Sequence, residues 1–345
     1  MAKKRLVSGM RTTGSLHLGH YEGTLKNWVK LQESYDCFYF AAVWHAFTDR
    51  LKIENLSQVI EEMIIDYISV GIDPEKVVLF RQSQMPQHAE LCTILSMFTP
   101  LGWLERCPTF KDDVRDEESR ERVSLGKLMY PVLMTADVAV YKSEVVPVGR
   151  DQLPHLELSR EILRRFNGQV EPVFPEPKEI LSDVPMLLGI DNRKMSKSYN
   201  NAIELRETPD SLQKKIQLMI TDPQRVRRND PGNPDVCTVF SYQKIYAPER
   251  LDEISQGCRS AGIGCRDCKG ILFEKINSLL EPFRARRAQL ESKKGFVQEV
   301  LTAGEKKAAA VAPAQPQRPK GCVSRTPYVG AMIMDVDTGA VLFEE

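Results

Sequence analysis

The sequence of 345 residues lacks any run of about 18 apolar residues, so it has no candidate for a membrane-spanning helix. It also lacks net charge, because 47 lysines and arginines balance 47 aspartates and glutamates. A protein that binds nucleic acid over most of its surface is usually basic, so any such contact is expected to be local. Lys3, Lys4 and Arg5 are not followed by an apolar segment, which argues against a secretory signal and leads us to expect a cytoplasmic protein.

Strand-like and helix-like patterns alternate through the first half of the chain. Apolar runs typical of buried strands occur at 4–8, 37–44, 77–80 and 145–148, the last preceded by an apolar segment at 134–141, and helical periodicity occurs at 57–70, 88–97 and 152–166. This alternation predicts an α/β fold with a doubly wound parallel sheet. Ligands of such folds bind beyond the carboxyl ends of the strands, where 17–20 and 149–152 are expected to lie.

The segment Gly14–His20 (GSLHLGH) follows the first expected strand. A glycine-bearing turn between a strand and a helix presents backbone N–H groups and the positive helix end to a phosphate. Gly19 leaves room for an adenine ring or a ribose against the backbone, and His17 and His20 can both donate to phosphate oxygens. The alternative is that both histidines are surface residues of a capped helix.

A second motif, Lys194–Ser198 (KMSKS), lies in a loop that also contains Gly189 and Asp191. Its lysines can close over pyrophosphate, and preorganised cations are the usual means of stabilising charge in a transition state. A lysine and serine run alone is most often a solvated loop. Together, and in this order, the two motifs predict a site that handles the triphosphate of ATP.

The pair of motifs resembles that of the class I aminoacyl-tRNA synthetases. Val123–Asp137 (VSLGKLMYPVLMTAD) and Val145–Glu157 (VVPVGRDQLPHLE) narrow the resemblance to tryptophanyl-tRNA synthetases, and it extends from about residue 5 to 312. It implies a Rossmann-like, HUP-type core, a homodimer, and a ligase that joins L-tryptophan to tRNA(Trp) through tryptophanyl-adenylate. ATP and Mg²⁺ are the implied cofactors.

The resemblance also implies the site residues. The catalytic residues are His17, His20, Lys194, Lys197 and Ser198. ATP is bound by Arg11, Thr12, Thr13, Gly19, His20, Gly149, Arg150, Asp151, Lys194, Met195, Ser196, Lys197 and Ser198. Tryptophan is bound by Gly9, Tyr130, Met134, Asp137, Val148 and Gln152.

Asp137 lies in the apolar stretch 132–140, where an unpaired carboxylate is costly, so we expect it to have a dedicated partner. The alternative is a structural role as a helix cap or as the partner of a lysine or arginine. The resemblance implies that Asp137 accepts the indole N–H and that Tyr130 and Gln152 bind the amino group. Such a pocket rejects amino acids without an N–H, so no editing domain is expected.

Three residues depart from the family pattern: Val43 replaces an acidic residue, Arg150 a glutamate and Lys127 an aromatic residue. They are the only support for a non-catalytic tryptophan- or RNA-binding protein of this fold. A tyrosyl-tRNA synthetase would share both motifs, but Asp137 argues against it. A small nucleotidylyltransferase with an HxGH site would be shorter and would not need a helical domain with four cysteines.

Four of the eight cysteines have the spacing C-x20-C-x6-C-x2-C: Cys237, Cys258, Cys265 and Cys268. In a cytoplasmic protein this spacing favours metal binding over disulfides. Four thiolates suit either tetrahedral Zn²⁺ or a [4Fe–4S] cluster, and the spacing alone slightly favours zinc. The resemblance favours the cluster, because one branch of these synthetases has one in its helical domain with nearly this spacing.

The change of pattern along the chain predicts four parts. We expect a catalytic domain at 1–198, an all-helical anticodon-binding domain at 199–281, a last helix at 282–307 that packs back on the catalytic domain, and a proline- and alanine-rich linker with an atypical tail at 308–345. Arginines at 225–228 and 284–287 are candidate RNA contacts, with solvated helix faces as the alternative. The tail contains a hairpin pattern at 330–343 and resembles the start of a penicillin-binding or D-Ala-D-Ala carboxypeptidase-type domain. We interpret it as a fusion or a shifted reading frame and assign it no function.

Overall fold

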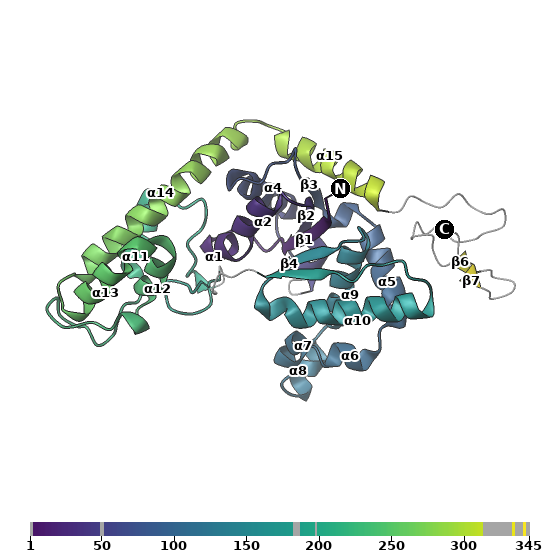
Figure 1. Cartoon of the computed structure of the whole chain (residues 1–345), viewed down its shortest axis with the longest axis horizontal. Helices are drawn as coiled ribbons and strands as arrows, with labels where there is room; N and C mark the ends of the chain where they lie inside the picture. The colour runs from purple at the N-terminus through teal and green to yellow at the C-terminus, as the bar shows by residue number, and fades with distance from the viewer. Residues whose placement is uncertain are drawn as a thin grey trace.

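The computed structural model describes residues 3–48, 52–181, 187–196 and 199–312, together with two short strands near the C-terminus. At its centre lies a parallel five-stranded sheet with the order β3-β2-β1-β4-β5 (Figure 1). The strands are β1 (Arg5–Arg11), β2 (Asp36–Ala42), β3 (Val78–Arg81), β4 (Val145–Val148) and β5 (Lys178–Leu181). The chain winds outward from β1 to β3 and then crosses back to β4, so the predicted doubly wound sheet is confirmed.

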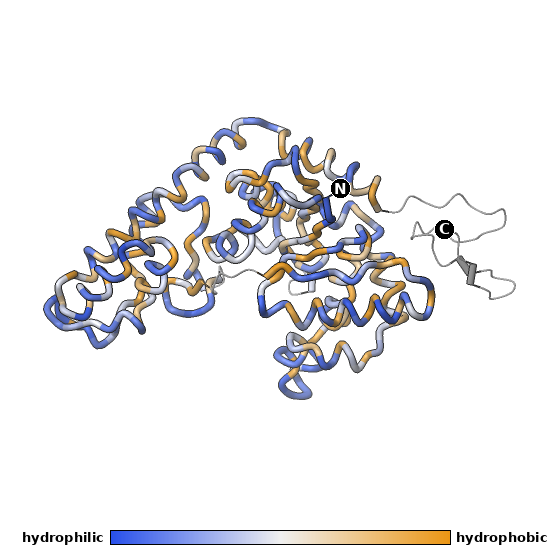
Figure 2. The backbone as a smooth tube through the Cα atoms, in the orientation of Figure 1, coloured by the Kyte–Doolittle hydropathy of each residue, from blue (hydrophilic) through white to orange (hydrophobic). Residues whose placement is uncertain are grey.

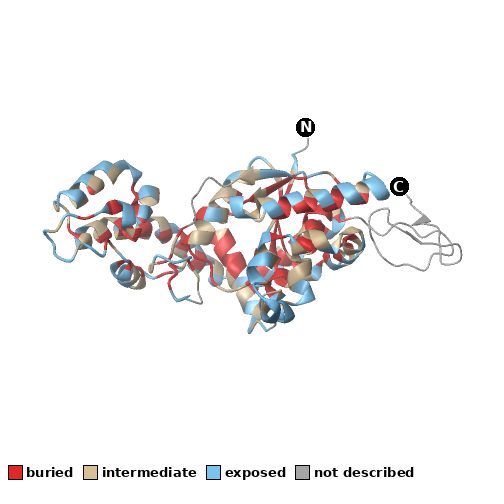
Figure 3. Ribbon diagram, turned by 90° about the horizontal axis from the view of Figure 1, so that it is seen from below, coloured by how far each residue is buried: buried red, intermediate tan, exposed pale blue. Residues whose placement is uncertain are grey.

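Alternate residues of each strand face opposite layers of helices, as the pleat of a strand requires. Leu6 and Tyr39 belong to one buried cluster and Val7 and Phe38 to another. The first cluster includes residues of α2 (Lys26–Leu31) and α4 (Leu56–Ser69), and the second includes α5 (Gln87–Phe98), α9 (Leu125–Ala139) and α10 (Leu153–Gln169). Figure 2 shows hydrophobic residues along the central strands, and Figure 3 shows the buried residues gathered around them.

Short helices complete the first part of the chain. They are α1 (Leu18–His20), the π-helical η1 (Tyr21–Leu25), α3 (Val43–Phe47), η2 (Gln82–Gln84), α6 (Leu101–Glu105), α7 (Pro108–Asp113), α8 (Glu117–Arg122) and η3 (Arg150–Gln152). The expected strand at 37–44 therefore ends at Ala42, because the chain turns into α3 there. The apolar segment before β4 is helical up to Ala139.

The second part is helical, as its composition predicts. It comprises α11 (Pro209–Leu218), η5 (Pro234–Val236), α12 (Thr238–Tyr246), η6 (Pro248–Arg250), α13 (Leu251–Arg259), α14 (Cys265–Glu291) and α15 (Phe296–Val311). At 27 residues, α14 spans about 40 Å and runs from the outer end of the helical part back to the sheet (Figure 1).

The last expected helix is in fact two helices. The chain breaks between α14 and α15 at Gly295, whose φ of 82° favours glycine. The helix α15 then packs along β3, which covers the open edge of the sheet. Gly304 makes this close approach possible, because a Cβ atom there would overlap the carbonyl oxygen of Leu79.

Near the C-terminus, β6 (Ile333–Met334) pairs antiparallel with β7 (Val341–Leu342), as the hairpin pattern predicts. The rest of the segment 313–345 lies outside the described residues. Among the helices that the structure describes, none is long and apolar enough to cross a membrane.

Candidate active site

The first motif forms the turn that leaves β1. The N–H of Thr13 donates to the Arg11 carbonyl at 2.9 Å, and Gly14 has a φ of 126°, which favours glycine. His17 precedes α1 and is 8% exposed, so it is not the surface residue of the alternative interpretation. The ring of His20 stacks on that of His17, with centroids 3.7 Å apart.

The His17 N–H donates to Nδ1 of His20 at 3.2 Å. Because Nδ1 accepts, the proton of a neutral His20 ring lies on Nε2. His20 can therefore donate a hydrogen bond from Nε2. Thr12 is fully buried, and its hydroxyl has no hydrogen-bond partner among the residues that the structure describes.

The second motif lies directly against the first. The N–H of Leu18 donates to the Ile203 carbonyl at 2.9 Å, and that of Leu205 donates to the Leu16 carbonyl at 3.0 Å. A Cβ atom on Gly19 would lie 3.6 Å from Sδ of Met195, which is buried. The structure thus brings the two motifs together although they are far apart in the sequence.

Asn201 organises the loop of the second motif. Its Oδ1 accepts from the Ser196 N–H at 2.8 Å, and its Nδ2 donates to Asp191 Oδ1 at 2.7 Å and to the Lys194 carbonyl at 3.1 Å. Gly189 is needed beside it, because a Cβ atom there would overlap the Asn201 side chain. Sequence reasoning missed Asn201, and Lys197 and Ser198 lie outside the described residues.

The carboxyl edge of the sheet collects every histidine of the sequence, which has five. One or two of them follow each of the strands β1 to β4, and the carboxyl ends of parallel strands meet at one edge. They are His17 and His20 after β1, His45 in α3 after β2, His88 in α5 after β3, and His155 in α10 after β4. This regular placement was a signal that sequence reasoning overlooked for the last three.

Asp137 has the dedicated partners that its buried position predicts. His45 Nε2 lies 2.8 Å from Oδ2, while Gln82 Nε2 and His88 Nδ1 lie 2.7 and 2.6 Å from Oδ1. Burial alone would raise the pKa of the Asp137 carboxyl, but the charges and hydrogen bonds of the two histidines outweigh it and lower that pKa. The partners are two histidines and an amide, rather than the lysine or arginine of the alternative interpretation.

Tyr130 and Gln152 are joined by a second polar chain. The Thr109 hydroxyl lies 3.5 Å from the Tyr130 hydroxyl and 2.6 Å from His155 Nε2. His155 Nδ1 lies 3.0 Å from Gln152 Oε1 and must donate to it, so a neutral ring accepts from Thr109. Burial lowers the pKa of His155, and the nearby charge of Asp151 opposes this shift. The Tyr130 ring lies between the rings of His45 and His155, with centroids 6.0 and 5.0 Å away.

The remaining predicted residues lie around these chains. The Phe40 ring occupies the space beside Gly9, so a Cβ atom at this position would overlap the ring. Val148 is buried and Met134 is half-buried. Gly149 precedes η3, where Arg150 and Asp151 are exposed, and Arg11 is exposed at the end of β1.

Comparison with known proteins decides the family. The family model of class I tRNA synthetases (W and Y) matches residues 2–281. A tryptophan–tRNA ligase of Thermotoga maritima is 45% identical, over 89% of this chain and 95% of that one, and a ligase of Aquifex aeolicus is 40% identical, over 89% and 96%. The tryptophanyl-tRNA synthetase from Campylobacter jejuni, solved with ADP and tryptophan, is 33% identical with a TM-score of 0.77, over 89% of this chain and 96% of that one. The chain belongs to the class I tryptophanyl-tRNA synthetases.

The tyrosyl alternative is therefore not supported. The tyrosyl-tRNA synthetase of Archaeoglobus fulgidus matches with 21% identity and a TM-score of 0.64, which shows a shared fold alone. The predicted tryptophanyl family is confirmed at far higher identity over nearly the whole length of its relatives.

Val43, Lys127 and Arg150, which depart from the family pattern, occupy a buried, an ion-paired and an exposed position in this tryptophanyl-tRNA synthetase. Val43 is buried in the core at the start of α3. Lys127 Nζ pairs with Asp113 Oδ2 at 3.2 Å, and Arg150 is exposed. None of the three donates to Asp137 in the hydrogen bonds described above.

The four cysteines of the tryptophanyl-tRNA synthetase lie at the ends of three helices. Cys237 precedes α12, Cys258 lies in the last turn of α13, and Cys265 and Cys268 lie in the first turn of α14. Burial raises the pKa of Cys268 to about 11, and the charges of the other three thiols add to this shift. Among the described residues, however, no three histidine, cysteine or acidic side chains are close enough to hold a metal ion.

Two of the arginines at 225–228 form hydrogen bonds within this cysteine region. Arg225 lies 3.8 Å from Cys258 Sγ and donates to the carbonyls of Arg228 and Ile263, and Arg228 donates to the carbonyl of Ala261. Arg227 remains exposed. In the second cluster, Arg284 donates to the Glu207 carbonyl, Arg287 pairs with Asp66, and Arg286 is exposed.

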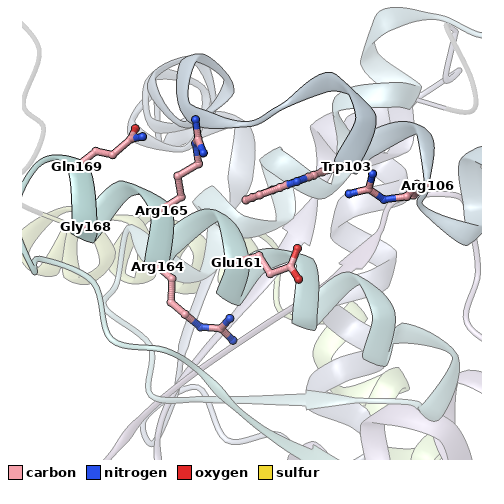
Figure 4. Close-up of a pocket in the computed structure, with 7 residues that line it drawn as sticks. All are labelled: Trp103, Arg106, Glu161, Arg164, Arg165, Gly168 and Gln169. Carbon is pink, nitrogen blue, oxygen red and sulfur yellow. The ribbon is translucent and has the colours of Figure 1, made fainter.

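A surface hollow between α6 and α10 is separate from the site (Figure 4). The Arg165 guanidinium lies 5.9 Å from the Trp103 ring centroid, and Arg164 pairs with Glu157 and Glu176. The lining contains no predicted site residue of the tryptophanyl-tRNA synthetase: it consists of Trp103, Arg106, Glu161, Arg164, Arg165, Gly168 and Gln169.

Proposed function

We propose that this chain activates L-tryptophan with ATP and transfers the tryptophanyl group to tRNA(Trp). The observation that carries the proposal is the packing of Gly19 against Met195, which joins the two motifs into one site. The buried and ionised Asp137 near the carboxyl edge of the same sheet supports tryptophan as the amino acid.

The reaction has two steps. The tryptophan carboxylate attacks the α-phosphate of ATP in line, which forms tryptophanyl-adenylate and releases pyrophosphate. The terminal ribose hydroxyl of the tRNA then attacks the activated carbonyl and releases AMP. No protein nucleophile is required, so the protein contributes positioning and neutralisation of charge. Mg²⁺ bound with ATP would supply further positive charge at the phosphates, beside the lysines of the second motif.

The ATP site has two sides in this proposal. The turn at 11–13 and the Nε2–H of His20 contribute hydrogen-bond donors from one side, together with the segment 149–151. Lys194 and Lys197 contribute positive charge from the other side as pyrophosphate forms. The contact between Gly19 and Met195 and the Asn201 hydrogen bonds support this arrangement, because they fix the described part of the lysine loop next to the first motif.

The tryptophan site is proposed around Asp137. Its Oδ2 accepts the indole N–H, while Tyr130 and Gln152 bind the amino group. Met134 and Val148 contact the ring, and Gly9 lies beneath it. The polar chain from Tyr130 through Thr109 and His155 to Gln152 supports a shared role for the two amino-group ligands.

The test is amino-acid-dependent exchange between ATP and pyrophosphate, followed by charging of tRNA(Trp). We expect exchange with tryptophan and not with tyrosine, and we expect Asp137→Asn to reduce kcat/KM for tryptophan. Folded protein that binds tryptophan without exchange would support the non-catalytic alternative. In that case the variants Val43→Asp, Lys127→Phe and Arg150→Glu test whether the unusual residues are the cause.

For the four cysteines we propose a [4Fe–4S] cluster, with Zn²⁺ as the alternative. Cys237, Cys258 and Cys265 contribute to the raised pKa of Cys268, so the four cysteines lie in one region of the helical part. Four thiolates can hold either a cluster or Zn²⁺. Arg225 and Gln243 lie 3.8 and 3.7 Å from the sulfurs of Cys258 and Cys268, where donors would stabilise a negatively charged cluster.

Anaerobic purification followed by iron, sulfide and zinc analysis tests this proposal. We expect about four irons and four sulfides per chain, on the stoichiometry of such clusters, and loss of both in Cys258→Ala. Cys92→Ala is the matched control, because Cys92 is buried in the catalytic part. Stoichiometric zinc would favour the alternative, and neither metal would contradict both.

We further propose that 1–198 forms the catalytic domain, that 199–281 binds the anticodon arm, that 282–307 docks on the catalytic domain, and that 308–345 has no part in the reaction. A homodimer is supported by exposed apolar residues on neighbouring helices, since Met97, Leu101 and Leu125 are 71%, 59% and 68% exposed. Sedimentation of the wild type and of Leu101→Glu tests this point. A tRNA-charging enzyme of this kind is expected to work in the cytoplasm, where its tRNA is used.

A further inference from the structure

The two oxygens of the Asp137 carboxylate accept different numbers of hydrogen bonds in the described part of the chain. Within the residues that the structure describes, Oδ1 accepts from both Gln82 and His88, whereas Oδ2 accepts from His45 alone. An ionised carboxylate offers about two acceptor positions on each oxygen. Among the described contacts, Oδ1 is therefore saturated and Oδ2 has one position open. The chemistry of this position suits one N–H donor.

The two histidines use opposite ring nitrogens. His45 donates through Nε2 and His88 donates through Nδ1, because an ionised carboxylate can only accept. The ring of His88 is completely buried and its Nε2 lies 2.9 Å from the Tyr141 hydroxyl. When the His88 ring is neutral, Nε2 accepts a hydrogen bond from the Tyr141 hydroxyl, and this bond keeps the single ring proton on Nδ1, facing Asp137.

Tyr141 is itself held in place. Its ring is completely buried and packs against Phe38 and Phe80, with centroids 5.0 and 5.4 Å away. It lies four residues after Asp137, just beyond the end of α9. Tyr141, His88 and Asp137 thus form one buried hydrogen-bond chain, supported by an aromatic core that the substrate does not touch in the proposed reaction.

We propose that His88 and Tyr141 are positioning residues for selection of the indole N–H, because they anchor Oδ1 and turn the open position of Oδ2 toward the substrate. This inference rests on the proposed function of Asp137 and deepens it. At metal sites, groups that orient a ligating side chain typically affect affinity or activity by roughly 10- to 100-fold without touching the metal, and we expect an effect of the same order here. Without the anchor, the carboxylate rotates and the N–H loses its acceptor.

The test compares tryptophan with 3-benzothienylalanine, in which sulfur replaces the indole N–H. Pyrophosphate exchange gives kcat/KM for both, and their ratio measures recognition of the N–H. The amide of His88→Asn can replace the Nδ1 donor, whereas the longer His88→Gln places its amide where Nε2 was. Tyr141→Phe removes only the hydroxyl. Tyr67→Phe is the matched control, because the Tyr67 hydroxyl is buried without a hydrogen-bond partner in the described part of the chain.

We expect the ratio to fall roughly 10- to 100-fold in His88→Gln and Tyr141→Phe, through the tryptophan value alone. It should stay close to the wild-type ratio in His88→Asn and Tyr67→Phe. An equal loss for both amino acids in all His88 variants would show a merely structural role and overturn the inference. A wild-type protein with equal kcat/KM for tryptophan and 3-benzothienylalanine would overturn the inference as well. Absence of any exchange in the wild type would instead refute the proposed function, and circular dichroism confirms that each variant is folded.

Discussion

Arg287 on α14 and Asp66 on α4 form a buried ion pair, with Nη1 and Oδ1 2.6 Å apart. The other oxygen of Asp66 accepts from the backbone N–H of Leu16 at 3.5 Å, one residue before His17. The helix that starts at the cysteine region is thereby connected to the loop of the first motif. The pair lies between the helical part and the candidate ATP site.

Replacement of Arg287 should destabilise the protein in a pH-dependent way. Burial raises the pKa of Asp66 to about 6, although Arg287 opposes the shift. Loss of the arginine leaves an unpaired buried charge, which typically costs about 3–5 kcal/mol. We expect that loss in Arg287→Met at pH 8, measured by urea unfolding.

The direction in which stability changes with pH follows from the pKa of Asp66 in the folded and unfolded states. An acid whose folded pKa exceeds its unfolded value stabilises the fold when protonated, and this contribution is lost as pH rises from about 3.8 through the folded pKa. Arg287→Met raises that folded pKa further, so its deficit should grow as pH rises above about 6. Arg286→Met is the control, because Arg286 is exposed. A deficit that does not change between pH 5 and 8 would contradict the prediction.

The packing of α15 on β3 predicts a difference between two helical glycines. Gly304→Ala places a methyl group into the Leu79 carbonyl and should destabilise by about 1–3 kcal/mol or more, as overpacking does. Gly270 lies in α14, and a Cβ atom added there would meet no described atom of another residue within 4 Å. Gly270→Ala should therefore stabilise the protein by about 0.5–1 kcal/mol. Thermal unfolding of both variants measures the difference, and equal effects would mean that α15 does not pack as described.

The hydrogen bonds of Asn201 predict a kinetic effect at a residue outside both motifs. Asn201→Ala removes three bonds from the lysine loop, and each buried group left unsatisfied costs about 1–3 kcal/mol. We expect kcat for pyrophosphate exchange to fall by roughly tenfold or more, since about 1.4 kcal/mol corresponds to a factor of ten. The Kd of tryptophan alone, measured by calorimetry, should not change. A weakened Kd together with an unchanged kcat would show that Asn201 acts elsewhere.

Gly232 tests the proposed cysteine site without removal of a cysteine. A Cβ atom there would lie 2.7 Å from Cys258 Sγ and 3.0 Å from Arg225 Cδ. We expect Gly232→Ala to displace the sulfur and reduce bound iron after anaerobic purification. Gly168→Ala is the control, because it meets no atom within 4 Å and lies far along the chain in α10. Full iron content in Gly232→Ala would contradict the proposed ligand set.

Local pattern was enough to predict the doubly wound sheet and the family, because strand periodicity and two short motifs are readable from neighbouring residues. It failed at the break near Gly295, where helical periodicity continues on both sides of a residue that needs a positive φ. The apolar stretch around Asp137 correctly predicted a buried carboxylate with dedicated partners. The pattern could not identify His45, Gln82 and His88 as those partners, because they follow other strands.

By itself, the sequence determined the strands, the two motifs, the family and the presence of four grouped cysteines. Only the tertiary structure decided that Gly19 lies against Met195, that His45, Gln82 and His88 surround Asp137, and that Asn201 holds the loop of the second motif. The physical reason is that hydrogen bonding and close packing join residues from separate strands and helices, whereas periodicity and motif spacing record only what is close along the chain.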